Sequence, residues 1–197
     1  MIDNDLIQVV ATRLEQASAA AGWHYLVLQK DQPTQQGIPY APTIFFEKLF
    51  DMQYGHPMID YEHNVYQPVK PNTFSETETQ IVETSFQISA LVIQEPKDLT
   101  LPTASDVAHY LKAYITSRPS IYAYRDLGVK VLRVTQIRNP WFQDERHRYE
   151  ANPNFDIVYI HDRPLTNTVG AANRVVGVTV PGVAGNGVFP VPDRPYG

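Results

Sequence analysis

The sequence contains no cysteine among its 197 residues. This absence excludes disulfide bonds, thiol catalysis and cysteine-ligated metal sites. No apolar run approaches the ~18 residues of a transmembrane helix, and the first residues lack the basic-then-apolar order of a signal peptide. We therefore expect a chain that neither spans a membrane nor is exported.

Long basic runs and catalytic signatures are also missing. The formal net charge is −5, which argues against a protein that grips nucleic acid through its phosphates. The chain has no phosphate-binding glycine loop, dinucleotide fingerprint or paired-acid motif. Ser85 and Ser89 lie in a predicted strand without the glycines of a nucleophile elbow. These observations predict a protein that is not an enzyme and that uses no cofactor.

The clearest pattern that is present lies in residues 78–94, ETQIVETSFQISALVIQ. Alternate positions from Val82 to Val92 carry apolar side chains or threonine, and the positions between them up to Ser89 are polar, which is the period of a half-buried β-strand. The length of this segment predicts a central strand. Its clean alternation indicates an antiparallel sheet with one wetter face, because strands covered on both faces read as continuous apolar runs.

Other segments complete an α+β fold. Residues 3–21 and 103–117 have helical apolar stripes with capping residues, and Thr103 with Asp106 resembles a capping box. Residues 120–127 allow one more helical turn before Gly128. Strand composition marks residues 23–30, 43–53, 129–138 and 154–162, while 54–77 and 139–153 are predicted as connecting loops. We expect a mainly antiparallel sheet with two helices packed mostly on one face.

The composition changes near residue 166, so we predict one domain over 1–165 and an extended arm over 166–197. The arm is rich in glycine, proline and valine and has three charged side chains. It is more apolar than an ordinary solvated linker. We therefore expect it to lie on another subunit, with Val175, Val176, Val188 and Phe189 as contact residues.

Two groups of polar residues were weighed as catalytic or metal sites. His56, Asp60 and His63 approach a metal cluster, but they lack helical spacing, so a solvated loop is the favoured interpretation and a small metal-dependent enzyme the alternative. His161 and Asp162 are adjacent in a predicted strand and should face opposite sides of the sheet. No metal site is predicted.

One group of residues near the predicted 139–153 loop was weighed as a binding surface. Trp141 and Phe142 lie beside Arg138 and could stack nucleic-acid bases. In a chain of net negative charge we interpret the three residues as an interface instead.

The run from Leu127 to Pro164 resembles the C-terminal part of the neck and tail terminator proteins of long-tailed, contractile-tailed bacteriophages. In that family, a strand ending in a basic residue and Asn-Pro leads through a charged loop to Glu, a Pro-containing turn and a last strand. The matching residues here are Arg138, Asn139, Pro140, Glu150, Asn152, Pro153 and Phe155. The resemblance extends more loosely over residues 3–165 and does not cover 166–197.

The resemblance implies a virion structural protein in the tail or neck, assembled in the host cytoplasm. It implies a homo-oligomeric ring, commonly a hexamer, that ends the tail tube and joins the tail to the head. The expected partners are the tail tube protein, the sheath protein and a head-completion or connector protein, and genomic DNA would pass through the lumen without specific binding. Another head-completion or baseplate adaptor ring is the alternative.

Overall fold

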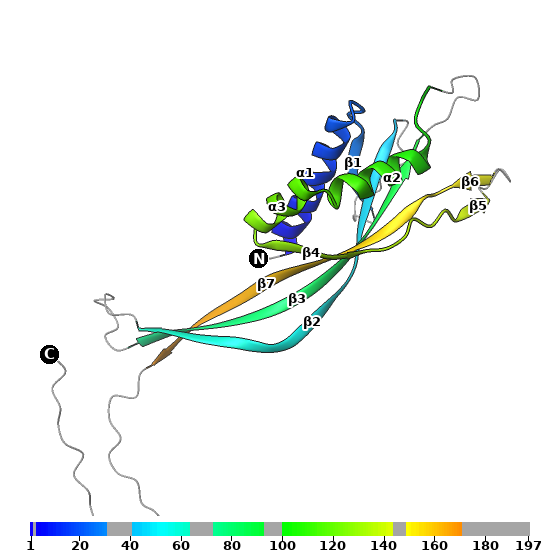
Figure 1. Cartoon of the computed structure of the whole chain (residues 1–197). Coiled ribbons are helices and arrows are strands. Elements are labelled where there is room, and N and C mark those ends of the chain that lie inside the picture. Colours follow the sequence, from blue (N-terminus) through cyan, green and yellow to red (C-terminus); the bar gives the residue numbers. More distant parts are fainter. Residues whose placement is uncertain (2, 31–40, 64–72, 93–99, 144–148, 171–197) are drawn as a thin grey trace, which may run out of the picture. The chain divides into compact units, whose positions relative to one another are not determined.

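The computed structural model describes residues 1, 3–30, 41–63, 73–92, 100–143 and 149–170. These residues form three helices and seven strands, as Figure 1 shows. The helices are α1 (Asp3–Ala20), α2 (Ala104–Ile115) and α3 (Arg118–Asp126). The strands are β1 (Leu26–Gln29), β2 (Thr43–His63), β3 (Thr73–Leu91), β4 (Val129–Val134), β5 (Trp141–Gln143), β6 (Tyr149–Ala151) and β7 (Asn154–Gly170). The predicted α+β class is confirmed.

The described strands other than β5 and β6 make one sheet in the order β1-β2-β3-β7-β4. The predicted long strand is therefore the central one, although β3 begins and ends earlier than residues 78–94. Neighbours among β2, β3 and β7 run in opposite directions (Figure 1), and β4 is antiparallel to β7. Because β1 pairs parallel to β2, the sheet is mixed but mostly antiparallel.

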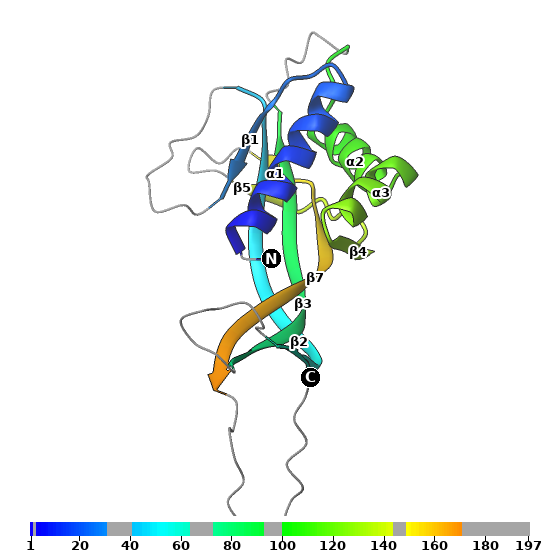
Figure 2. The same ribbon diagram turned by 90° about the vertical axis from the view of Figure 1, so that its left-hand side faces the viewer.

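All three described helices lie on one face of the sheet, as Figures 1 and 2 show. The expectation of two helices was wrong in number, since the segment after Thr116 forms a separate helix of nine residues. Pro119 ends one helix and opens the next, because proline lacks a backbone N–H and is tolerated only in a first helical turn. Ser117 caps α3 by accepting a hydrogen bond from the backbone N–H of Ser120.

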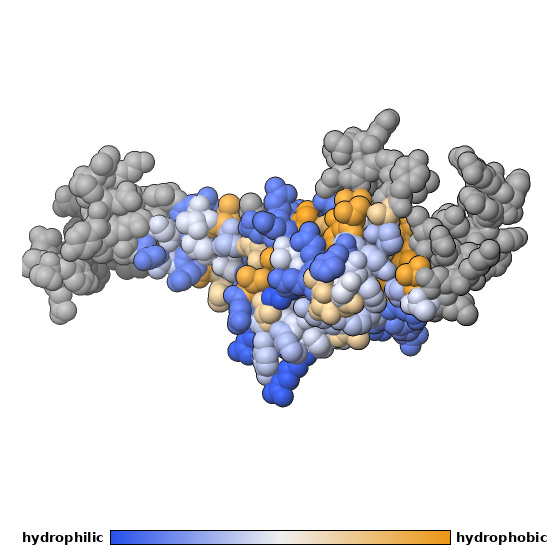
Figure 3. Space-filling model, turned by 90° about the horizontal axis from the view of Figure 1, so that it is seen from above, coloured by the Kyte–Doolittle hydropathy of each residue, from blue (hydrophilic) through white to orange (hydrophobic). Residues whose placement is uncertain are grey.

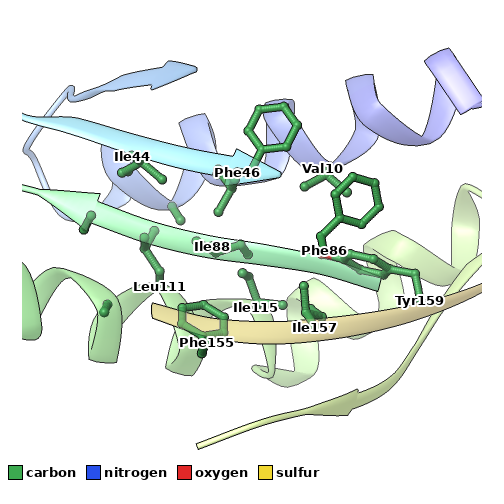
Figure 4. Close-up of a cluster of buried hydrophobic side chains, with 14 of the residues drawn as sticks. Val10, Ile44, Phe46, Phe86, Ile88, Leu111, Ile115, Phe155, Ile157 and Tyr159 are labelled. Atoms are coloured by element: carbon green, nitrogen blue, oxygen red, sulfur yellow. The ribbon is translucent and has the colours of Figure 1, made fainter. Parts of the chain in front are cut away.

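The core lies between the helices and the sheet (Figure 4). The strands contribute alternate residues to this core, as the sequence pattern predicted. The helices contribute the apolar stripes of α1 and α2. The main members are Leu6, Val10, Leu14, Ile44, Phe46, Phe86, Ile88, Leu111, Ile115, Phe155, Ile157 and Tyr159. Tyr124 and Tyr159 share a hydrogen bond of 3.1 Å inside this core, and burial raises the pKa of Tyr124 to about 12.

The helix-free face of β3 is drier than predicted. Glu83 and Ser85 point away from the helices, yet both are buried. Gln87, two residues further along, is half-buried and donates a 3.2 Å hydrogen bond to Asp156 of β7. The prediction that successive side chains of β3 point to opposite faces is therefore correct. The prediction that the helix-free face is exposed to solvent is wrong at the middle of the sheet.

The predicted loop over residues 54–77 is mostly strand. β2 continues to His63 and β3 begins at Thr73, while residues 64–72 lie outside the described part of the chain. Gly55 and Pro57 suggested a break. Gly55 adopts a positive φ of 71°, which glycine accepts without steric cost, and proline is tolerated where a strand lies at a sheet edge.

Other boundaries also differ from the sequence prediction. β4 ends at Val134 of the expected 129–138, and Arg138 forms only an isolated bridge with Asn154. β1 covers only Leu26–Gln29 of the expected 23–30, and His24 has a positive φ of 54°. The expected loop over 139–153 contains the antiparallel pair β5 and β6. β7 continues to Gly170, so the first residues of the predicted arm belong to a strand.

The chain divides into two compact units. The first contains Met1–Ile59 and Glu78–Leu165, and it holds the helices and the core. The second contains Asp60–Thr77 and Thr166–Gly197; within its described residues, Thr77 and Thr166 share a hydrogen bond of 3.1 Å. No helix in the described ranges is long and apolar enough to cross a membrane.

Candidate functional site

A cluster of polar side chains joins β2, β3 and β7 at one end of the core. Thr84 Oγ1 donates a 2.7 Å hydrogen bond to Asp51 Oδ1 and lies 3.1 Å from Nε2 of His161. Lys48 Nζ lies 2.6 Å from Asp51 and 2.7 Å from Asp3 of α1. The cluster therefore ties the start of α1 to the three longest strands.

The roles of the atoms in this cluster exclude an activated nucleophile. The hydroxyl hydrogen of Thr84 goes to Asp51, so Thr84 accepts from an N–H at Nε2 of His161. A general base needs its free ring nitrogen toward the hydroxyl, and here that position carries the hydrogen. Nδ1 of His161 has no hydrogen-bond partner among the described residues. The composition is that of a hydrolase triad, but its geometry is structural.

Burial and neighbouring charges set the protonation of the cluster. Burial lowers the pKa of His161, because the charged imidazolium loses its hydration. Burial alone would raise the pKa of Asp51, but hydrogen bonds from Lys48 and Thr84 outweigh it and lower that pKa. Hydrogen bonds from Lys48 to Asp3 and Asp51 likewise outweigh desolvation and raise the pKa of Lys48. The structure thus holds an ion pair beside a neutral histidine.

Arg138, predicted as an interface residue, belongs to a second network on the sheet. Its guanidinium lies 2.6 Å from Asp156 Oδ1, and its side chain is half-exposed. Asp156 also accepts from Gln87, and its backbone N–H donates to Thr135 Oγ1. Arg138 therefore has an internal structural partner while part of its side chain stays open to contact.

The described part of β2 after the core carries an unusual set of exposed apolar side chains. Leu49, Phe50, Met52 and Tyr54 are 41 to 61% exposed. Asp51, the one charged residue among them, points inward to Thr84 and Lys48. On the helix side, seen in Figure 3, apolar patches likewise interrupt a mostly hydrophilic surface. An exposed apolar surface of this kind marks a site of protein contact.

The side chains of Lys48 and Asp51 meet although they are three residues apart in a strand. Regular alternation would place them on opposite faces. The carboxylate of Asp51 nevertheless reaches Lys48 and Thr84, while Phe50 and Met52 are exposed. The strand predicted over 43–53 is too short to include this whole surface, although Phe50, Met52 and Tyr54 alternate with polar residues in the sequence.

The residues weighed as a metal site are spread along β2. His56 and Asp60 are exposed in the strand. No group of three His, Asp or Glu side chains within the described ranges is arranged to hold a metal ion. His161 is buried and Asp162 is exposed, so the prediction that these neighbours face opposite ways is confirmed.

The remaining predicted interface residues are only partly placed. Trp141 and Phe142 lie in β5, whose backbone pairs with β6, and their side-chain surroundings are not described. Val175, Val176, Val188 and Phe189 lie outside the described residues. The proposed arm contacts therefore stay predictions.

Comparison with known families decides between the classes that the geometry leaves open. Residues 5–171 match the family model described as E217 gateway protein gp29. The chain belongs to this gateway family. The match spans the helices from Asp5 onward, the sheet and the strand residues of the polar cluster, and it places the chain among phage neck proteins and virion structural components. No curated protein matches the chain.

Proposed function

We propose that this gateway-family chain forms a closed ring in the phage neck that terminates the tail tube and joins the tail to the head. The observation that carries the proposal is the family match over residues 5–171. A structural role agrees with the polar cluster, in which the hydroxyl of Thr84 is committed to Asp51 and cannot act as a nucleophile.

A ring requires two different surfaces on each subunit that meet head to tail. The exposed apolar stretch of β2 supplies one such surface, because burying it in a contact removes apolar side chains from water. We propose a homo-hexamer, as the resemblance to tail terminators implies. The neighbours along the neck would be the tail tube, the sheath and a head-completion protein, with assembly in the host cytoplasm.

The net charge of −5 is compatible with a ring whose inner wall faces passing DNA. Like charges on protein and duplex disfavour adhesion of the genome to the ring. The DNA would therefore cross the lumen without specific binding.

The proposal is tested by amber mutation of the gene in a phage that carries it, followed by electron microscopy of the lysate. Loss of a terminator should leave tubes that keep growing beyond normal length, together with filled heads that lack tails. Supplying the intact chain in trans should restore normal particles. Normal tailed particles without this protein would contradict the proposal.

The word gateway in the family description favours a second candidate, a neck adaptor ring on the head side of the joint. Without such an adaptor, tails should reach normal length and still fail to join heads. Tail length in the same lysate therefore separates the two candidates.

A further inference from the structure

The described sheet has open backbone edges on both sides, at the same level along the strands. β1 pairs only with Thr43–Phe46 of β2, so from Glu47 to Ile59 the outer edge of β2 has no strand beside it in the described part of the chain. β4 pairs with β7 only as far as His161. At Asp162 the amino group of Met1 donates a 2.6 Å hydrogen bond to the backbone carbonyl. From Arg163 to Leu165, the outer edge of β7 has no strand beside it among the described residues.

Contacts across the sheet show that these two edges are level with each other. Thr84 of β3 bonds to Asp51 on one side and lies beside His161 on the other. Gln80, four residues along β3, donates to the carbonyl of Tyr54 at 2.9 Å. The segment from Asp51 to Tyr54 therefore lies opposite the segment that begins at His161, with β3 between them.

The β2 edge has few exposed charges. Exposed charges, particularly lysine, protect many natural edge strands against pairing. Between Leu49 and Tyr54 the only charged side chain is Asp51, whose carboxylate is bonded to Thr84 and Lys48. Four apolar side chains remain on the surface beside unpaired backbone groups. Gly55 and Pro57 then interrupt the edge, which limits any pairing to about this stretch.

We propose that the β2 edge from Glu47 to Tyr54 pairs with the β7 edge from Arg163 to Leu165 of a second copy of this chain. The inference rests on the proposed ring and names its interface. Both edges belong to one chain and differ from each other, so each copy offers one of each and the contact propagates head to tail until it closes. In a closed ring neither of these two edges is left free.

The strand directions favour this occupant. β2 and β7 are each antiparallel to β3, so they run the same way (Figure 1). Copies related by rotation about a ring axis would therefore pair β7 with β2 in parallel. A two-fold dimer would instead place β2 against β2 in antiparallel fashion. Leu165, which is 59% exposed, adds an apolar side chain on the β7 side.

The test uses introduced cysteines, which report cleanly because the chain has none of its own. Met52→Cys or Tyr54→Cys is combined with Arg163→Cys or Leu165→Cys in the full chain, and the assembled protein is oxidised. A disulfide needs Cβ atoms about 3.5–4.5 Å apart. At least one double variant should give a ladder of covalent multimers on a non-reducing gel, whereas the single variants should stay monomeric.

The matched control pairs Met52→Cys with Ile121→Cys, which is 44% exposed on α3 and belongs to neither edge. An equal ladder from this control would show random collision and overturn the inference. Dimers from Met52→Cys or Tyr54→Cys alone would show two-fold β2 pairing and also overturn it.

A charge variant gives an independent measurement. Met52→Lys with Tyr54→Lys should abolish the ring while the melting temperature of the subunit stays within about 2 °C, because both side chains are already solvated in the monomer. Ile121→Lys should leave the ring intact. Rings that persist in the double lysine variant would overturn the edge pairing.

The failure of this inference and that of the proposed function are distinguishable. Rings in the neck that cross-link through none of the four cysteine pairs reject the edge pairing and leave the proposed function standing. Absence of the protein from the neck rejects both.

Discussion

Phe86 and its neighbour Gln87 lie on opposite faces of the central strand. Phe86 is fully buried against Phe46 and Tyr159, whereas Gln87 is half-buried on the other face. Phe86→Asp should cost several kcal/mol, because a carboxylate without a partner would enter the core. That cost approaches the whole ~5–15 kcal/mol stability of a domain.

Gln87→Ala should cost only about 1 kcal/mol, the net value of its one hydrogen bond to Asp156. Chemical denaturation of the two variants checks the difference. Equal midpoints would mean that Phe86 is not a core residue.

His161 should make the folded state sensitive to mild acid. Its pKa is lowered from 6.5 by burial, so below about pH 6.5 the unfolded chain binds a proton that the folded chain does not. Stability attributable to His161 is complete above this pH and falls as the pH drops toward the lowered folded pKa. The loss has a limiting slope of about 1.4 kcal/mol per pH unit.

The measurement is the free energy of unfolding between pH 7.5 and pH 5 in the intact chain and in His161→Gln. The variant should show a shallower decline. His109→Gln, at an exposed position of α2, is the matched control and should retain the original slope. A steep decline that survives in His161→Gln would assign the acid sensitivity to another group.

At the scale of one element, α2 depends on its cap. Thr103 accepts from the backbone N–H of Asp106, and Asp106 accepts from the backbone N–H of Thr103 at 3.0 Å. The Asp106 carboxylate also accepts a 2.7 Å hydrogen bond from the Thr103 hydroxyl, and the bonds that it accepts from the backbone and hydroxyl of Thr103 lower its pKa. This capping box was predicted from the sequence and is confirmed.

Thr103→Ala should destabilise the fold by about 1 kcal/mol, because the backbone N–H of Asp106 loses its acceptor, the Thr103 hydroxyl. Thermal melting against Ser105→Ala, in the same first turn, measures the effect of the cap alone. A loss of the same size in Ser105→Ala would show that the position, and not the cap, matters.

At the scale of the whole molecule, residues 171–197 should be dispensable for folding and needed for assembly. The helices, the sheet and the core lie within residues 1–170. A chain truncated after Gly170 should therefore keep its melting transition, whereas a cut after Pro164 would also remove Thr166, the partner of Thr77. Any apolar contact that the removed valines make on a neighbour would contribute about 25 cal/mol per Å² only in the complex.

The measurements are subunit melting and incorporation into phage particles supplied in trans. An unfolded truncation would place these residues in the core. Normal incorporation would make them a passive tail, and either result would contradict the prediction of a contact arm.

The sequence by itself determined those features of the protein that a few neighbouring residues encode, namely the type and position of single helices and strands. The alternation around Phe86 identified the central strand, the stripe of Val10 and Leu14 identified α1, and Thr103 with Asp106 identified the start of α2. Each of these signals is local, because the strand period, the helix period and a cap all act over about one to four residues. The family resemblance carried the class of function.

Only the tertiary structure decided what depends on distant residues meeting. β2 continues past Gly55 and Pro57 because β3 pairs beside it, which no local propensity encodes. Thr84, read as one more residue of the core face, holds Asp51 and lies against His161, residues 33 and 77 positions away. The carboxylate of Asp51 is bonded to Thr84 and Lys48, and the apolar residues around it on β2 are exposed. Long-range pairing of this kind fixes which side chains face solvent, and hence which surface is available for assembly.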